Sequence, residues 1–105
     1  MSKHAPDAAV EVRHNAEASR FEAEVEGGLC VASYQLVDGV MRIHHTEVPS
    51  RLEGRGIASQ IVREALAYAE AHGLAVEPRC SFVRNYMRQH PDAQRLLPER
   101  LRLGR

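Results

Sequence analysis

Residues 48–59, VPSRLEGRGIAS, connect a predicted strand to an amphipathic helix through a loop that contains two glycines. Glycine permits a sharp turn and a close approach of the backbone to a ligand. The first N–H groups of a helix lie at the positive end of its dipole, so they attract phosphate or pyrophosphate. Arg51 and Arg55 would add positive charge beside them. The pattern predicts a phosphate site, although an ordinary strand-to-helix connection has the same pattern.

The residues after the loop have a helical period. Apolar side chains recur at three- and four-residue spacing, which predicts a helix over residues 57–72 that ends at Gly73. A strand is predicted over residues 74–80, where Pro78 removes a ladder donor and makes it an edge strand or one splayed from its neighbour. A short helix follows over residues 82–89, and the leucines near the end predict one more short helix.

The residues before the loop have the pattern of antiparallel strands. Strands are predicted around Val10 and Val12 and over residues 21–25, 29–37 and 40–48. The dipeptides Gly27-Gly28 and Asp38-Gly39 predict tight hairpin turns between them. One face of the second strand would be solvated and would carry Glu22, Glu24 and Glu26. Four strands followed by a helix, a strand and a helix predict an α+β fold.

The chain length suits one domain with one core, since there are 105 residues. We expect a flexible N-terminus over residues 1–9, a folded domain over residues 10–97 and a basic C-terminal tail over residues 98–105. The 14 basic and 14 acidic side chains balance, which argues against a dedicated duplex-DNA-binding protein. Residues 51–105 carry ten basic and six acidic side chains, an excess that would attract a small polyanion or simply make the helices soluble.

The two cysteines, Cys30 and Cys80, are too few for a disulfide framework. The sequence also contains no apolar run of the length that crosses a membrane and no segment with the pattern of a signal peptide. We therefore expect a reduced, cytoplasmic protein with no membrane association.

The glycine loop is one of several motifs. Val48, the two loop glycines and Ile57-Ala58 resemble the acetyl-CoA-binding motif of the GNAT N-acetyltransferase superfamily. Further segments match a short GNAT-like subfamily with a cysteine at the end of the fifth strand, in the same order and separation: residues 45–49 (HTEVP), 78–83 (PRCSFV) and 86–91 (YMRQHP). The resemblance covers residues 10–97 and implies a mostly antiparallel central sheet with a long helix packed on it.

The resemblance implies that acetyl-CoA is the cosubstrate. Its pantetheine arm would lie between the fourth and fifth strands, where backbone N–H groups near Glu47 and Val48 would polarise the acetyl carbonyl. The first position of the glycine motif is usually Gln or Arg, but here it is Glu53 in one register and Arg51 in the other. The side chain that contacts pyrophosphate therefore stays open. The residues implied to hold acetyl-CoA are Val48, Arg51, Glu53, Gly54, Arg55, Gly56, Ile57, Ala58, Ser59, Arg84 and Asn85.

The candidate catalytic residues are Cys80, Tyr86, His45 and Glu47. His45 or Glu47 would act as the base towards the amine, but His45 also fits a core position beside Met41 and Ile43. Tyr86 matches the tyrosine that protonates the departing thiolate in many GNAT enzymes, or it packs on its helix. Cys80 would protonate the thiolate, carry the acetyl group as a nucleophile, or be an inert core residue.

The resemblance implies an N-acetyltransferase that moves the acetyl group to an unidentified amine, of a small molecule or a protein, by direct attack on the thioester. The alternative is a non-catalytic acyl-CoA or CoA-binding module, because the chain has little room for the helices that usually wall the acceptor site. A third hypothesis, an RNA-associated accessory protein, lacks aromatic stacking platforms, so we expect no nucleic-acid partner. Adjacent His44 and His45 point to opposite faces of a strand, so we expect no metal.

Overall fold

The computed structural model describes residues 9–102, so the predicted flexible N-terminus at residues 1–9 lies almost wholly outside the described residues. The strands are β1 (Arg13–Asn15), β2 (Arg20–Val25), β3 (Gly28–Val37), β4 (Val40–Glu47) and β5 (Ala75–Pro78). The α-helices are α1 (Ile57–Ala71) and α2 (Ser81–Gln89), and the 3₁₀ helices are η2 (Ser50–Leu52), η3 (Pro91–Leu96) and η4 (Glu99–Leu101).

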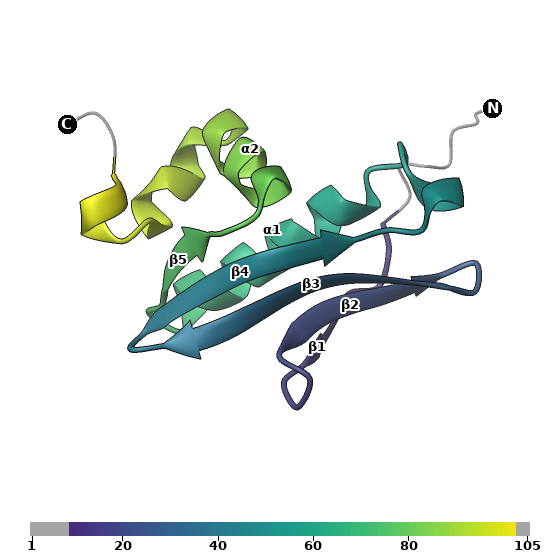
Figure 1. Ribbon diagram of the computed structural model, residues 1–105, viewed down its shortest axis with the longest axis horizontal. Coiled ribbons are helices and arrows are strands. Elements are labelled where there is room, and N and C mark those ends of the chain that lie inside the picture. Colours follow the sequence, from purple (N-terminus) through teal and green to yellow (C-terminus); the bar gives the residue numbers. More distant parts are fainter. Residues whose placement is uncertain (1–8, 103–105) are drawn as a thin grey trace.

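The strands form one sheet in the order β1-β2-β3-β4-β5 (Figure 1). The first four are antiparallel to their neighbours, while β5 pairs with β4 in parallel. This confirms the predicted α+β fold with a mostly antiparallel sheet. The helix α1 lies against one face of the sheet, and buried apolar residues from both make the core. The largest fully buried side chains are Met41, Ile43, Leu52, Ile61, Met87, Val62, Val76, Val83 and Cys30.

Both predicted hairpin turns are present. Asp38 and Gly39 have φ of +51° and +79°, and Glu26 and Gly27 have φ of +50° and +79°. Positive φ at both central residues is typical of the type I′ turn that fits the twist of a hairpin. The first turn lies one residue earlier than predicted, because Gly28 already pairs with β2 as the first residue of β3.

The predicted element boundaries differ from the structure at both ends of the chain. The strand expected around Val10 and Val12 begins only at Arg13, although both valines pack against the core. The strand β5 is shorter than predicted, because it ends at Pro78 and only the N–H of Arg79 still reaches β4 beyond it. The single helix expected near the C-terminus is instead the two 3₁₀ helices η3 and η4, and η4 lies within the predicted basic tail.

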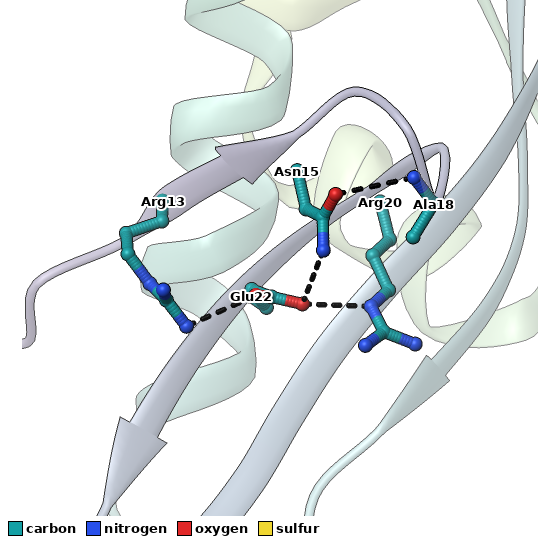
Figure 2. Close-up of polar contacts among 5 residues, drawn as sticks. All are labelled: Arg13, Asn15, Ala18, Arg20 and Glu22. Atoms are coloured by element: carbon teal, nitrogen blue, oxygen red, sulfur yellow. Dashed lines mark hydrogen bonds and ion pairs between the residues drawn. The ribbon is translucent and has the colours of Figure 1, made fainter.

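The prediction that Glu22 lies on a solvated face of β2 is wrong, because this residue is only 5% exposed. Its carboxylate accepts hydrogen bonds from Arg13 Nη2 at 3.0 Å, Arg20 Nε at 2.7 Å and Asn15 Nδ2 at 3.5 Å (Figure 2). Arg13 lies directly opposite Glu22 on β1, so the strand pairing brings the two together. The hydrogen bond from Arg20 is the main reason that the pKa of Glu22 lies below its usual range.

This network gives the first prediction. Glu22→Gln should lower the free energy of unfolding by about 1–3 kcal/mol at pH 7, since it leaves charged partners without their carboxylate. The lowered pKa means that this stabilisation is complete above about pH 4.5 and is lost as the pH falls through the native-state value. Urea unfolding at pH 7 and pH 3 should therefore show a difference from wild type that shrinks in acid. The exposed Glu24→Gln is the control, and an equal difference at both pH values would contradict a charge effect.

Candidate functional site

A β-bulge in β4 determines where the side chains at its end point. Tyr34 of β3 pairs with Ile43, and the preceding Ser33 pairs with His45, so His44 is the extra residue. A one-residue bulge reverses the inward and outward alternation that follows it. Ile43 is buried, whereas His45 is exposed. The alternative that placed His45 in the core beside Met41 and Ile43 is therefore wrong.

The strands β4 and β5 part at the same place. Their parallel pairing ends with Ile43 opposite Pro78, and the next contact is the hydrogen bond from Arg79 N to Ile43 O at 2.8 Å. The part of β4 beyond Ile43 has β3 on one side and, among residues 9–102, no strand on the other. This confirms the prediction that the proline-containing strand is an edge strand and separates from its neighbour at Pro78.

A cavity of about 520 Å³ lies beside this unpaired end of β4. It is bounded by the end of β4, the loop that contains η2 and the two glycines, the N-terminus of α1 and the first turn of α2. Its lining residues are Thr46, Glu47, Val48, Leu52, Glu53, Gly54, Gly56, Ile57, Ala58, Ser59 and Phe82. Eight of these positions are among those implied by the motif resemblance. The structure thus brings most of the predicted glycine-loop residues together around one space.

The backbone of the glycine loop is open to the approach of a ligand. Gly54 and Gly56 have φ of +83° and +76°, and a Cβ atom added at either would meet no heavy atom within 4 Å. Gly56 is the N-cap of α1, with no side-chain hydrogen bond to the first turn and no acidic residue in it. Within residues 9–102 no side chain caps this end of α1, so its first N–H groups are suited to a phosphate.

The side chains of the two loop arginines point away from the cavity and towards Glu26. Arg55 donates two hydrogen bonds to the Glu26 carboxylate, at 3.3 and 2.7 Å, and Arg51 donates to the Glu26 carbonyl at 2.7 Å. Arg55 holds the pKa of Glu26 below its ordinary value. Neither arginine lines the cavity, whereas Glu53 does. Of the two possible motif registers, the structure places the first residue of one, Glu53, at the cavity and that of the other, Arg51, away from it.

The candidate bases lie side by side at the end of β4. Glu47 lines the cavity, and its Oε1 is 3.3 Å from His45 Nε2. The His45 side chain is 54% exposed and does not itself line the cavity.

The candidate acids are separated from one another. Cys80 is the N-cap of α2, and its Sγ is 3.9 Å from the Oγ1 of Thr46, which lines the cavity. Tyr86 lies in a different cavity with Arg63 and stacks on His90 at 4.0 Å between ring centroids. Burial raises the pKa of the Tyr86 hydroxyl.

The predicted ligand-binding residues of α2 also lie away from this cavity. Arg84 lines another cavity, beside β5, and Asn85 Oδ1 accepts a hydrogen bond from Arg88 at 2.8 Å. The sequence interpretation missed Thr46, Leu52 and Phe82 as lining residues. Leu52 was detectable as an isolated apolar residue in a polar loop, but the positions of Thr46 and Phe82 depend on the parting of the strands.

Two further findings apply to residues 9–102. No three His, Cys, Asp or Glu side chains lie close enough together to hold a metal ion. No helix in this part of the chain combines the length and the apolar character that crossing a bilayer would need.

Comparison with known proteins agrees with this geometry. Residues 20–96 match the domain family described as GCN5-related N-acetyl-transferase. Protein NATD1 of Xenopus tropicalis is 28% identical over 94 residues, which cover 87% of this chain and 86% of that protein. Protein NATD1 of Homo sapiens is 29% identical over 90 residues, which cover 83% of this chain and 80% of that protein. The NMR structure of a GCN5-like protein from Staphylococcus aureus shares the fold, with a TM-score of 0.69 at 20% identity over 87% of this chain and 90% of that one.

Proposed function

Since the chain belongs to the GCN5-related N-acetyltransferase family, we propose that it transfers the acetyl group of acetyl-CoA to an amine. The observation that carries the proposal is the cavity between the unpaired end of β4, the glycine loop and the N-terminus of α1. The cavity joins the N-terminus of a helix, which attracts anions, to a strand end that pairs with no strand on one side among residues 9–102. Acetyl-CoA offers both a pyrophosphate and an amide-containing arm.

The residues present fit this ligand. The open space over Gly54 and Gly56 allows phosphate oxygens to approach the backbone N–H groups at the start of α1. Leu52, Ile57 and Phe82 give the cavity an apolar lining against which an uncharged arm can pack.

The bound ligand would supply an acetyl thioester, and the chain's own groups would direct the transfer. The amine nitrogen bonds to the acetyl carbon as the carbon–sulfur bond breaks, the amine loses a proton and the thiolate gains one. Backbone N–H groups at Glu47 and Val48 would donate to the acetyl oxygen as its negative charge grows. The Glu47 carboxylate would take the amine proton, directly or through water, and His45 would pass it to solvent.

We assign the return of a proton to the thiolate to Cys80 rather than to Tyr86. The Cys80 thiol contacts Thr46 of the cavity wall, whereas Tyr86 lines a separate cavity. In this assignment Cys80→Ala slows thiol release and leaves the affinity for CoA unchanged. Unchanged turnover in the variant would identify Cys80 as a packing residue only.

The first experiment is isothermal titration of acetyl-CoA and CoA into the purified protein, followed by a screen of amines for thiol release. Binding together with amine-dependent thiol release supports the proposed reaction. Binding without release for any amine would favour the alternative, a non-catalytic CoA-binding module. No binding at about millimolar ligand, equivalent to a free energy weaker than about −4 kcal/mol, would overturn both.

Glu53 gives a second prediction, because this acidic residue lines a cavity that we assign to an anion. Glu53→Gln should tighten CoA binding by roughly two- to tenfold at low ionic strength, since it removes like-charge repulsion at an exposed position. Titration calorimetry at low and high salt measures this, and the gain should shrink as salt is added. The exposed Glu64→Gln on α1 is the matched control, and weaker binding by the Glu53 variant would contradict the assignment.

A further inference from the structure

A second cavity, of about 360 Å³, lies where β5, α2, η3 and η4 meet, and it shares no lining residue with the first. In Figure 1 these elements follow one another from the green strand β5 to the yellow end of the described chain. The apolar lining residues are Pro78, Met87, Leu97 and Leu101, and the charged lining residues are Glu77, Arg79, Arg84 and Arg88. Apolar and positively charged surfaces therefore face the same space.

The single carboxylate of this cavity is already neutralised. Glu77 is ion-paired with Arg42 at 3.1 Å, with Arg100 at 3.6 Å and with Arg79 at 3.8 Å. Its side chain is 13% exposed, so three guanidinium groups share one largely covered negative charge. This leaves an excess of positive charge around the cavity, which an anion would reduce.

The other two lining arginines have no carboxylate partner within residues 9–102. Arg84 and Arg88 are four residues apart on α2 and so project from the same helix face. Within the described part of the chain, the one side-chain hydrogen bond of this pair runs from Arg88 to the neutral amide of Asn85. Both guanidinium groups thus keep donors that can bind a ligand.

We propose that this cavity binds a small molecule with a carboxylate on an apolar stem. A guanidinium group matches a carboxylate with two parallel hydrogen bonds, and Arg84 and Arg88 supply two such groups at the rim. The stem would pack on Met87 and Leu97, which are buried in the floor. The cavity volume lies at the lower end of the usual range for small-molecule sites. The proposal does not rest on acetyl transfer, because the two cavities have separate linings.

The test uses hexanoate as the probe and ¹H–¹⁵N correlation spectra of the labelled protein as the readout. Hexanoate should shift the amide signals of Arg84, Met87 and Leu97. Acetate, which lacks the stem, and hexanol, which lacks the charge, should each bind at least about tenfold more weakly. CoA should shift a different set of amides, those of the glycine loop. No shifts at the second cavity with hexanoate, or equal binding of hexanol, would overturn the proposal.

Variants provide the second arm of this test. The double variant Arg84→Gln/Arg88→Gln should weaken hexanoate binding by about tenfold or more, because both charge-assisted pairs are lost. Both side chains are exposed, so the dispersion of the spectrum should be retained. Arg63→Gln, at an exposed arginine of α1 outside this cavity, should bind hexanoate as wild type does. Equal affinity of the double variant and wild type would overturn the role of the arginines.

Discussion

Ser59→Asp should weaken CoA binding by about one to two orders of magnitude and leave the fold at least as stable as that of the wild-type protein. Ser59 lies in the first turn of α1 and lines the first cavity. A carboxylate there interacts favourably with the positive end of the helix dipole, which stabilises the free protein by about 0.3–1 kcal/mol. The same charge would face the pyrophosphate at roughly 6 Å, and at an effective dielectric of about 20 the repulsion costs about 2–3 kcal/mol.

This cost corresponds to a loss of affinity of roughly 30- to 150-fold. Titration calorimetry measures the affinity, and thermal unfolding of the free protein measures the stability. Ser59→Ala, which removes the hydroxyl but adds no charge, is the matched control and should bind CoA within about threefold of wild type. This design separates loss of the ligand from loss of the fold, which aspartate at Gly54 or Gly56 would not, because both glycines have positive φ. Tight CoA binding by Ser59→Asp would contradict a pyrophosphate at this helix end.

The glycine loop could be predicted because its signal is local. Positive φ at Gly54 and Gly56, the start of α1 and the end of β4 all follow from residues close together in the sequence. The same is true of the turn at Asp38-Gly39, where the dipeptide itself favours the required conformation. Local patterns therefore located most of the lining of the first cavity.

The directions of individual side chains could not be predicted, because contacts distant in the sequence determine them. Glu26 lies in the turn between β2 and β3, yet it binds both Arg51 and Arg55 and draws them away from the cavity. Glu22 is buried because Arg13 of the neighbouring strand pairs with it, and the alternation of residues within β2 does not reveal this partner.

The bulge at His44 also changes the direction of the side chain of a catalytic candidate, His45. A strict two-residue alternation places His45 on the same face as Ile43, and one extra residue reverses that assignment. The bulge coincides with the end of the pairing between β4 and β5, so the backbone is irregular where the cavity begins. Bulges are frequent next to functional sites, and their position depends on the partner strand as much as on the bulged one.

Leu52→Ala should cause a large loss of stability and weaken CoA binding at the same time. Leu52 is 1% exposed, lines the first cavity and belongs to η2, immediately before the glycine loop. A Cβ atom on Gly28 would lie 3.0 Å from Leu52 Cδ1, so the leucine packs tightly on the hairpin between β2 and β3. Removing a buried leucine side chain costs about 2–5 kcal/mol, a large fraction of the stability of a small domain.

The loss of affinity follows from the same contact. Without Leu52 the loop loses its apolar anchor, and CoA binding must then supply the free energy that orders Gly54 and Gly56. Urea unfolding measures the stability, and calorimetry at a temperature where the variant is folded measures the affinity. Leu36→Ala, at a leucine that is 54% exposed on β3, should change both by less than about 0.5 kcal/mol. Leu52→Met, which nearly conserves volume, should retain most of the stability and the affinity. If Leu52→Ala lost stability but bound CoA as tightly as Leu52→Met, the glycine loop would hold its shape without this anchor, and the leucine would serve the core alone.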